Sequence, residues 1–515
     1  MKNVLDYLEK SAKDYKNKVA IIEDQSSITY NELLNMSQGM GTVVAEKNIE
    51  VNNPIPIIVF MDKGIKALVS FLGIVYSGNF YAMANVDLPD DRLKSQQLVL
   101  GAGYIITDSG YVDRAKQIYE AADIINIDDY IVNKPMSVNE KLLSDIRSRH
   151  LDVNPLYANF TSGSTGIPKA VLVNHRSVID FIDCFTDIFG INQEDVLANQ
   201  APFDFDVSVK DIYSTLKKGA TLVIIPKEYF SQPVKLLDML CEKNITTMIW
   251  AVSALCLITT FHGLDYKVPE KVNKVLFSGE VMPMKHLATW MKHLPEAVFV
   301  NLYGPTEITC NCTYHVVERD RDYSNVLPIG KPFPNEEIIL LDVNDTPVNE
   351  TGKTGEICVR GTALALGYYN SVEQTSKAFC QNPLNKFYPD IIYRTGDLGY
   401  YNELGELCFN GRKDFQIKHM GHRIELEEIE LAINNIDGVE RSSVVFYEEK
   451  SKLYGFYIGD VDKRELHRIL SERLPVFMVP GILERVEEFP LTKNGKTDKR
   501  KLLQDKLDKR GMRAK

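Results

Sequence analysis

Short runs of apolar residues alternate with helix-like patterns through most of the chain. The clearest runs cover residues 55–61, 104–107, 221–225 and 274–277, and each has the length of a buried strand. Strands that alternate with helices in this way predict mainly parallel sheets whose faces are covered by helices. We therefore expect a large α/β domain built from layered sheets.

The sequence pattern changes near residue 342, where glycine residues begin to interrupt the apolar runs. Segments 337–347, 355–361 and 400–411 combine short apolar runs with Asn, Asp and Gly, the residues that favour tight turns. These segments predict hairpins in a smaller β-rich layer that closes the large domain.

A separate unit is predicted after Gly411. Segment 423–438 has the pattern of a helix that begins among acidic residues and stops at Gly438. One face of this helix would carry four apolar side chains, Leu426, Ile429, Ile433 and Ile436. Two strand-like runs, 442–449 and 453–459, and a second helical pattern, 463–474, come next.

The chain therefore divides into two predicted domains. The first covers residues 1–411, and the second is a small, mobile α+β domain over residues 415–515, with the boundary at the polar segment 412–414. The chain length also indicates at least two domains, because 515 residues exceed the roughly 250–300 residues that can fold around one hydrophobic core.

The amino-acid composition and the net charge exclude some classes of protein and disfavour others. With 44% hydrophobic and 25% charged residues the chain is typical of a globular protein, which excludes a disordered or fibrous one. The formal net charge of -11 disfavours nucleic acid as a partner, because an acidic chain has no general attraction to the phosphate backbone.

The chain has no predicted membrane segment. Its longest apolar stretch, residues 67–76, is about half of the roughly 20 residues that a membrane helix needs. Segment 1–22 has helical spacing but no continuous apolar signal core, so we expect a cytoplasmic protein. Of the eight cysteines only Cys310 and Cys312 stand close together, and no further Cys or His pair completes a zinc pattern.

The most informative segment, TSGSTGIPK at 161–169, predicts a phosphate-binding loop. Its small residues allow backbone N–H groups and three hydroxyls to surround a phosphate, and Lys169 adds a positive charge. The loop is not of the Walker type, because Pro168 precedes the lysine and Ala170 has no hydroxyl for magnesium. A flexible Ser/Gly surface loop is the alternative, and the Pro-Lys ending between two predicted strands disfavours it.

Five segments resemble, in order, the signature motifs of the adenylate-forming superfamily. They are TSGSTGIPKA (161–170), NLYGPTE (301–307), YRTGD (393–397), NGRKDFQIKHMGHRIELEEIE (410–430) and NGKTDKR (494–500). Within the superfamily, NQAPFDFDVSVKDIY and LFSGEVMP look most like the D-alanine–D-alanyl carrier protein ligases, which begin the D-alanylation of teichoic acids. Stand-alone adenylation domains of nonribosomal peptide synthetases are near neighbours.

The resemblance implies a two-step reaction. An amino acid and ATP would give an aminoacyl adenylate and pyrophosphate, and the acyl group would then move to the phosphopantetheine thiol of a carrier protein. No carrier module follows residue 501, so we expect the carrier on another chain. A non-catalytic nucleotide-binding homologue and a coenzyme A ligase are the alternatives.

The family assigns a role to each residue that handles ATP. Lys496 is similar to the lysine that bridges the attacking carboxylate and the α-phosphate, and Glu307 to the Mg²⁺ ligand. Thr306 would donate to phosphate, Asp397 would accept from the ribose hydroxyls, and Arg412 would contact ribose or phosphate. The remaining predicted ATP-site residues are Thr161, Ser162, Gly163, Ser164, Thr165, Gly166, Lys169, Gly279, Glu280, Asn301, Tyr303 and Gly304.

Without the family, several of these residues have simpler interpretations. Lys496 would be one more solvated lysine, and Thr306 with Glu307 would be the polar first turn of a helix. Tyr303 could pack against adenine, or it could fill the core as most aromatic residues in such positions do.

Asp206 is similar to the family aspartate that pairs with the ammonium group of the substrate. Burial of an ammonium without a counter-ion is costly, so this residue would select amino acids over simple acids. The alternative places Asp204 and Asp206 on the surface of an alternating strand. The other predicted pocket residues are Val207, Lys210, Ala251, Leu276, Ser278, Leu302, Cys310 and Asn311.

Two of these positions depart from the D-alanine ligase pattern. That pattern has threonine where Ala251 stands and cysteine where Ser278 stands. Val207, Leu276, Ser278 and Leu302 also resemble pockets that select serine, so L-serine is the alternative substrate to D-alanine. One methylene or hydroxyl changes binding by only about 1–3 kcal/mol.

The resemblance also implies that the small domain rotates between the two steps. The hinge maps to Asp414, and the rotation would bring in segment 416–423, which includes Lys418. Gly421 in that segment would leave room for the phosphopantetheine arm.

Overall fold

The computed structural model describes residues 1–47, 53–131, 136–163, 166–323, 326–413, 416–490 and 497–509. The chain forms two compact units. The first unit comprises Met1–Val86, Leu100–Asn159 and Ala170–Lys413, and the second comprises Asp87–Val99, Phe160–Lys169 and Asp414–Lys515. The sequence had placed the two short segments of the second unit in the large domain.

A nine-stranded sheet forms the centre of the first unit. Its strand order is β15-β14-β13-β12-β11-β9-β10-β1-β2, and the six strands from β13 to β1 run parallel. The strands in chain order are β1 (Val19–Glu23), β2 (Ser26–Thr29), β9 (Val196–Asn199), β10 (Thr221–Ile224), β11 (Thr247–Ala251), β12 (Lys274–Ser278), β13 (Val298–Tyr303), β14 (Thr313–Val316) and β15 (Lys331–Pro332).

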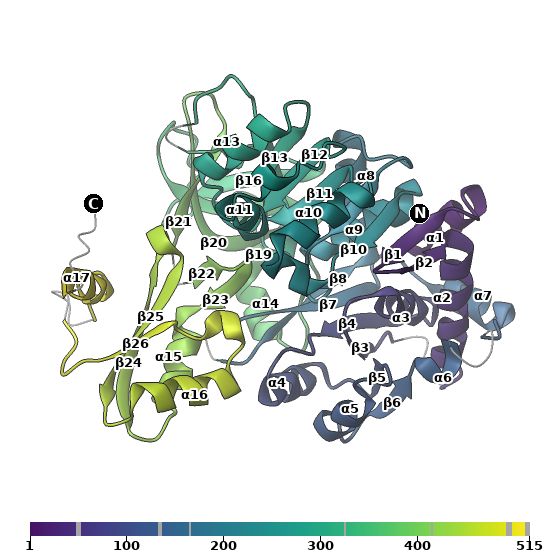
Figure 1. Cartoon of the computed structure of the whole chain (residues 1–515), viewed down its shortest axis with the longest axis horizontal. Coiled ribbons are helices and arrows are strands. Elements are labelled where there is room, and N and C mark those ends of the chain that lie inside the picture. Colours follow the sequence, from purple (N-terminus) through teal and green to yellow (C-terminus); the bar gives the residue numbers. More distant parts are fainter. Residues whose placement is uncertain are drawn as a thin grey trace. The chain divides into compact units, whose positions relative to one another are not determined.

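Both faces of this sheet are buried, and alternate side chains enter different cores. On β11, Trp250 belongs to a core formed with helices α10 (Pro233–Glu242), α11 (Val252–Thr260) and α13 (Met284–His293) (Figure 1). Ile249 belongs instead to the core that contains α8 (His175–Ile188) and α9 (Val207–Lys218). On β12, Phe277 and Leu276 divide in the same way. The strands of a sheet that is buried on both faces are continuously apolar in sequence. For this reason the apolar runs at 221–225 and 274–277 correctly predicted strands β10 and β12.

A seven-stranded sheet forms the second layer, in the order β18-β8-β7-β4-β3-β5-β6. Its strands are β3 (Pro56–Phe60), β4 (Phe80–Ala84), β5 (Tyr104–Thr107), β6 (Asp123–Asn126), β7 (Pro155–Thr161), β8 (Lys169–Asn174) and β18 (Gly367–Tyr368). Helix α3 (Ile65–Tyr76) is buried on nearly all sides and packs closely against α2 (Tyr30–Ala45). An apolar surface all round is typical of a helix enclosed by other elements.

The region in which glycine interrupts the apolar runs forms a five-stranded antiparallel sheet, which is the predicted β-rich layer, although segment 355–361 is one strand, β17, and not a hairpin. The strand order is β16-β17-β20-β19, and β21 pairs with β20. The strands are β16 (Glu336–Leu341), β17 (Gly355–Gly361), β19 (Phe379–Gln381), β20 (Ile391–Tyr401) and β21 (Leu407–Arg412).

The described helices of the first unit lie mostly between these strands in sequence. They are α1 (Leu5–Asp14), α2, α3, α5 (Val112–Ile118), α6 (Asp128–Ile131), α7 (Glu140–Arg149), α8 (His175–Ile188), α9 (Val207–Lys218), α10 (Pro233–Glu242), α11 (Val252–Thr260), α12 (Gly263–Tyr266), α13 (Met284–His293) and α14 (Val372–Ala378), with short 3-10 turns η1 (Lys227–Ser231) and η2 (Thr306–Ile308).

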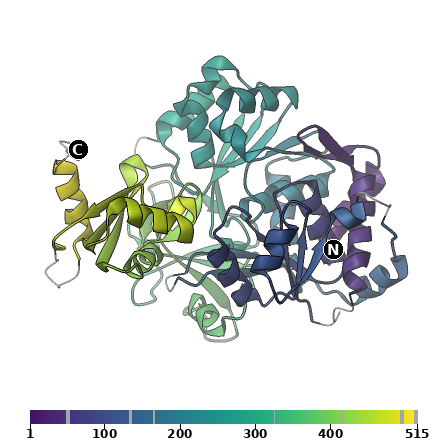
Figure 2. The ribbon, with the colours of Figure 1, turned by 60° about the horizontal axis from the view of Figure 1, so that its bottom comes forward.

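The second unit contains a two-stranded hairpin and a three-stranded sheet. Strands β24 (Val439–Tyr447), β25 (Lys452–Gly459) and β26 (Ile482–Arg485) form the sheet, and α15 and α16 pack against it through a common apolar core (Figure 2). The remaining elements are α4 (Asp90–Leu100), β22 (Gln416–His419), β23 (His422–Glu425), α15 (Leu426–Asn434), η3 (Glu448–Lys450), α16 (Lys463–Arg473), η4 (Val476–Met478) and α17 (Lys499–Lys509).

The helix predicted over 423–438 is shorter than its sequence pattern. Residues 423–425 belong to β23, and α15 ends at Asn434, before Gly438 adopts a φ of 86° in the turn into β24. The pairing of β22 with β23 explains the late start, because a strand ladder and a helix compete for the same backbone groups.

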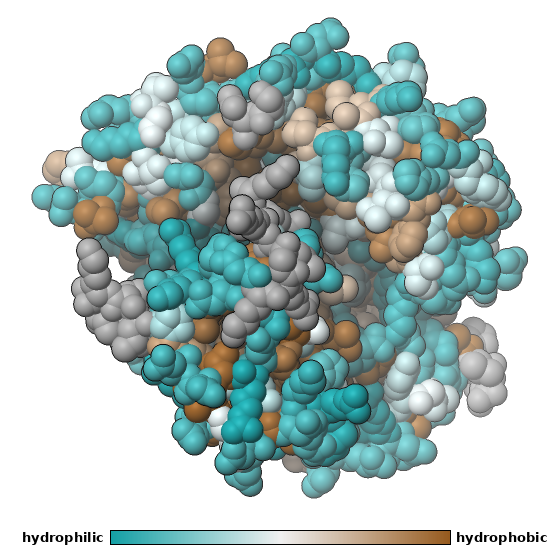
Figure 3. Space-filling model, turned by 60° about the vertical axis from the view of Figure 1, so that its left-hand side comes forward, coloured by the Kyte–Doolittle hydropathy of each residue, from teal (hydrophilic) through white to brown (hydrophobic). Residues whose placement is uncertain are grey.

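Within the described residues, none of the helices is long and apolar enough to cross a membrane. The face of the molecule in Figure 3 is largely hydrophilic, and its hydrophobic side chains occur in small groups between polar ones.

Candidate active site

A buried carboxylate joins two sheets of the first unit. Asp397 on β20 lies directly opposite Arg412 on β21 in the antiparallel register, and the Arg412 guanidinium pairs with its Oδ1. The hydroxyl of Tyr303, at the end of β13, donates to the other oxygen, Oδ2, at 2.5 Å. Each oxygen keeps a further lone pair, so a fully anchored Asp397 can still accept hydrogen bonds from a ligand.

Tyr303 itself is a core residue in this structure. Its ring is 7% exposed and lies in an apolar cluster with Ile308 and Cys312. Burial first, and then the charge of Asp397, raise the pKa of its hydroxyl well above the usual range, so the hydroxyl remains a donor. Contact between this ring and adenine stays a prediction.

Glu307 lies one short turn away from Tyr303, in η2. It is 1% exposed, and its Oε1 accepts a hydrogen bond from the hydroxyl of Tyr368 at 2.7 Å. Gly304 is required in this turn, because a Cβ there would lie 2.5 Å from the Cα of Asn311. The turn therefore brings residues 304–307 against the loop that carries Cys310 and Asn311.

The Glu307 carboxylate is a hard oxygen ligand of the kind that Mg²⁺ takes in proteins. No group of three or more His, Cys, Asp and Glu side chains suited to a metal ion occurs in the described part of the chain. Mg²⁺ usually needs only one or two protein carboxylates beside water and phosphate oxygens, so a single buried Glu307 is compatible with such a site.

A second group of polar residues gathers at the carboxyl ends of the parallel strands. Ala251 ends β11 and Ser278 ends β12, and the two residues are register partners. In open α/β sheets, ligands bind beyond this edge of the strands. Asp206 stands at the same edge, as the residue before the first turn of α9.

Direct contacts connect this group. The Lys210 ammonium donates to Asn311 Oδ1 at 2.7 Å and lies 3.5 Å from Ser278 Oγ. The Cys310 thiol donates to the Asp206 carbonyl oxygen at 3.3 Å. Burial, together with the negative charge of Asp206, raises the pKa of Cys310 well above its usual range and keeps this thiol neutral.

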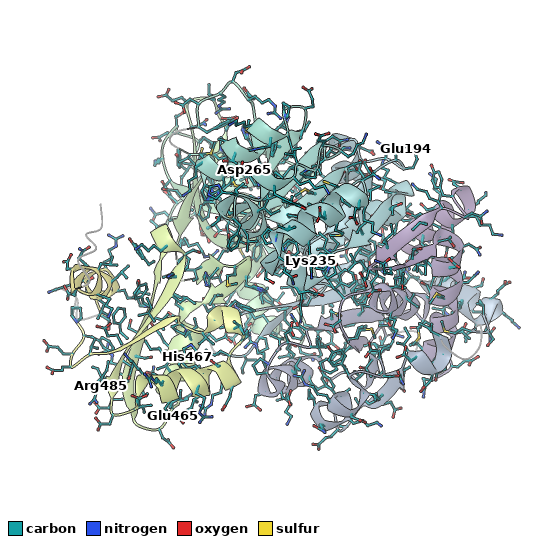
Figure 4. All side chains as sticks on the ribbon, viewed as in Figure 1. Glu194, Lys235, Asp265, Glu465, His467 and Arg485 are labelled. Carbon is teal, nitrogen blue, oxygen red and sulfur yellow. The ribbon has the colours of Figure 1, made fainter. Side chains whose placement is uncertain are left out.

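A different cavity of about 220 Å³ lies beside α10 and is lined by Lys235; Figure 4 labels this residue. Its other lining residues include Tyr229 of η1, Asp238 of α10, and Asp24 in the turn between β1 and β2. None of the described residues that the sequence assigned to ATP or amino acid lines it.

The family model described as AMP-binding enzyme matches residues 8–369, which is more than half of the chain. The chain belongs to the AMP-binding enzyme family. It therefore shares the adenylate-forming fold, as the sequence motifs predicted.

Two curated relatives and one solved structure illustrate the range of the family. A D-alanine–D-alanyl carrier protein ligase of Bacillus cytotoxicus is 31% identical over 98% of this chain and 99% of its own length. The Delta-poly-L-ornithine synthetase of Acinetobacter baumannii is 30% identical over 96% of this chain, which spans 36% of that protein. Holo-PA1221, an NRPS protein containing adenylation and PCP domains, superposes with a TM-score of 0.84 at 23% identity, over 98% of this chain and 84% of that chain.

This AMP-binding enzyme has its predicted amino-acid residues close together. Lys210 contacts Asn311 and Ser278, the adjacent Cys310 contacts the Asp206 backbone, and all five residues are 9% exposed or less. Val207, Leu276 and Leu302 are buried as well. The alternative for Asp206, an exposed position on an alternating strand, is wrong, because the residue precedes a helix and lies in the interior.

Other predicted ATP-site residues of the first unit have structural partners of their own. The Asn301 amide donates to the Pro328 carbonyl at 2.9 Å. Gly279 follows β12 with a φ of 98°, a conformation that favours glycine, and Glu280 is partly buried. Thr306 opens the η2 turn.

The predicted phosphate loop belongs to the second unit. Ser162 Oγ donates to the Arg423 carbonyl at 2.9 Å, and a Cβ on Gly163 would lie 2.1 Å from the Ile167 carbonyl oxygen. Gly166 has a φ of 79°, whereas Thr161 and Lys169 are strand residues. Ser164 and Thr165 lie outside the described residues.

Gly421 has a local structural reason to be glycine. It follows Met420 in the two-residue turn between β22 and β23, where both residues have positive φ, 53° and 81°. Such a turn needs glycine whether or not a ligand passes it. Lys418 lies on β22 opposite Arg423, while the predicted catalytic Lys496 and hinge residue Asp414 lie outside the described residues.

Sequence reasoning missed Tyr368, although its hydroxyl contacts the predicted metal ligand. Tyr368 is on β18, a two-residue strand that pairs with β8, and it lies 61 positions from Glu307 in the chain. Its segment has no glycine-rich or charged motif that would indicate a role, so only the fold reveals the contact.

Proposed function

We propose that this chain activates a small amino acid with ATP and transfers it, as a thioester, to the phosphopantetheine of a separate carrier protein. The observation that carries this proposal is the buried position of Asp206 among Lys210, Ser278, Cys310 and Asn311 at the carboxyl edge of the central sheet. A buried carboxylate in a cluster of this size is suited to the ammonium group of an amino acid.

The chemistry requires two nucleophilic attacks. In the first, the substrate carboxylate attacks the α-phosphorus of ATP, and the bond from that phosphorus to pyrophosphate breaks. In the second, a thiolate attacks the acyl carbon and AMP leaves. Both attacking groups are anionic, so positive charge and fixed donors must oppose their repulsion.

Within this proposal each charged residue has one task. Asp397, held by Tyr303 and Arg412, would accept hydrogen bonds from ribose. Lys496 would neutralise the approach of carboxylate to phosphate. Glu307 would hold Mg²⁺, which supplies charge neutralisation for the leaving pyrophosphate.

D-alanine is the substrate that we favour, with the chain acting in the D-alanylation of teichoic acids. The similarity to a D-alanine–D-alanyl carrier protein ligase along 99% of that ligase supports this choice. L-serine is the second candidate, because the Ser278 hydroxyl and the Asn311 amide lie beside the Lys210 ammonium. A substrate hydroxyl would find hydrogen-bond partners in that cluster.

Amino-acid-dependent exchange of pyrophosphate into ATP tests the proposal. We expect exchange with one of D-alanine, L-alanine, glycine, L-serine or L-cysteine, and loading of a phosphopantetheinylated carrier protein but not of coenzyme A. Exchange only with acids that lack an amino group would refute the role of Asp206. The absence of pyrophosphate release with every substrate would instead favour a non-catalytic nucleotide-binding protein.

A further inference from the structure

Lys63 reaches from the loop between β3 and α3 to the end of strand β9. Its ammonium lies 3.0 Å from Asn199 Oδ1, 3.3 Å from the Asn199 carbonyl, 3.0 Å from the Gln200 carbonyl and 3.4 Å from the Ala201 carbonyl. One cation therefore binds the backbone at the point where β9 ends.

The backbone that Lys63 holds leads directly to Asp206. Between β9 and α9 the chain has no regular structure, yet Ala201 and Phe203 are 3% exposed or less. Buried carbonyl groups outside helices and strands need other partners, because leaving them without hydrogen bonds is costly. Lys63 supplies donors for the Gln200 and Ala201 carbonyl groups of this loop, whereas the Asn199 carbonyl, at the end of β9, also accepts the Ile225 backbone N–H.

An amide connects Lys63 to helix α9. The Asn199 side chain accepts from Lys63 and donates, through Nδ2, to Asp211 Oδ2 at 2.8 Å. Asp211 is fully buried on α9, five positions after Asp206, and its other oxygen has no hydrogen-bond partner among the described residues. Burial raises the pKa of Asp211 to about 7 and lowers that of Lys63 to about 8.

The same loop also contacts the opposite wall of the predicted pocket. Gln200, whose backbone carbonyl accepts from Lys63, also accepts a hydrogen bond through its side-chain Oε1 from the Ala251 backbone N–H, at 3.1 Å. The loop therefore connects β9, the start of α9 and the end of β11.

We propose that Lys63 is a positioning residue for the amino acid substrate, and that it acts by holding loop 199–206 so that Asp206 and Ala251 keep their places in the pocket. This inference rests on the proposed function, and it assigns a specificity role to a residue outside the sequence motifs. Displacement of a substrate-binding group by about 1 Å can reduce an enzymatic rate by about a hundredfold, so the loop has to be held firmly.

A second lysine provides a matched control. Lys274 donates to Asp195 Oδ1 at 2.9 Å, and Asp195 precedes the opposite, amino end of the same strand β9. Both lysines make partly buried polar contacts to the chain around β9, but Lys274 lies at the end of the strand that is remote from Asp206. A purely stabilising role would give the two lysines the same phenotype.

The experiment measures amino-acid-dependent exchange for wild type, Lys63→Met, Lys63→Arg and Lys274→Met, with thermal unfolding of each variant. We expect Lys63→Met to raise the KM for the amino acid at least tenfold, with the KM for ATP changed less than twofold. Lys63→Arg should recover most of the affinity, because it keeps donors near the carbonyl groups. Lys274→Met should lower the melting temperature and leave both KM values unchanged.

The inference is overturned if Lys63→Met changes both KM values equally, if Lys274→Met reproduces its effect, or if the arginine variant is no better than methionine. If Lys63→Met does not fold, the Asp211→Asn variant tests the inference in its place. We expect Asp211→Asn to raise the KM for the amino acid at least threefold and to leave the KM for ATP unchanged. Wild-type enzyme without exchange activity refutes the proposed function, and this inference with it. Active wild type with an unchanged amino acid KM in the variants refutes the inference alone.

Discussion

Replacement of Tyr303 by phenylalanine removes one of the two anchors of Asp397. The hydroxyl of Tyr303 donates to Asp397 Oδ2 at 2.5 Å, while Arg412 holds the other oxygen. Tyr303 is 7% exposed and Asp397 4%, so water cannot easily take the place of the lost donor. A hydrogen bond to a charged group contributes about 1.5–3 kcal/mol, and we expect the first unit to lose stability by that amount.

The same change should weaken ATP binding without affecting the amino acid. With Arg412 still in place, we expect the KM for ATP to rise roughly tenfold, which corresponds to about 1.4 kcal/mol. Urea unfolding followed by tryptophan fluorescence measures the stability, because both tryptophans, Trp250 and Trp290, are buried in the first unit. Pyrophosphate exchange at varied ATP and varied amino acid measures the two KM values.

Tyr30→Phe is the matched control. Tyr30 is fully buried, and its hydroxyl donates to the Thr215 and Ala220 carbonyls, which are neutral acceptors. We expect this variant to lose about 1–2 kcal/mol of stability and to keep the wild-type KM for ATP. If Tyr303→Phe also keeps that KM, or if Tyr30→Phe raises it as much, the assignment of Asp397 to the ribose is wrong.

Three further predictions concern other residues. Burial lowers the pKa of His150 to about 4 and that of His175 well below its usual value. Below about pH 6.5 these histidines bind protons in the unfolded state but not in the folded state. The free energy of unfolding should therefore decrease below that pH, by up to about 1.4 kcal/mol per pH unit for each histidine. A urea midpoint that is constant from pH 7 to pH 5 would contradict this prediction. Asp206→Asn should raise the KM for the amino acid at least tenfold and leave that for ATP unchanged, and an equal rise in both would argue against a contact with the substrate ammonium. Lys496→Ala should abolish adenylate formation yet retain transfer from preformed adenylate to a carrier protein, measured as two separate half-reactions, with the exposed Lys501→Ala as the control that keeps both.

The sequence by itself determined the class of fold and most of the strands. The runs at 104–107 and 274–277 became β5 and β12, because strands buried on both faces must be continuously apolar. The helix over 423–438 was predicted too long, because the apolar spacing of β23 and α15 is continuous, and only the pairing of β23 with β22 interrupts the helix.

The motifs also identified the candidate site residues, but not the contacts that hold them in place. Asp397 and Arg412 stand in separate motifs, and their direct opposition across β20 and β21 depends on a strand register that neither motif encodes. The Tyr303 contact with Asp397 joins residues 94 positions apart, and that of Lys63 with Asn199 joins residues 136 apart. Such contacts arise only when separate sheets and loops pack, because a side chain's hydrogen-bond partners are set by position in space, whereas the sequence reports only neighbours along the chain.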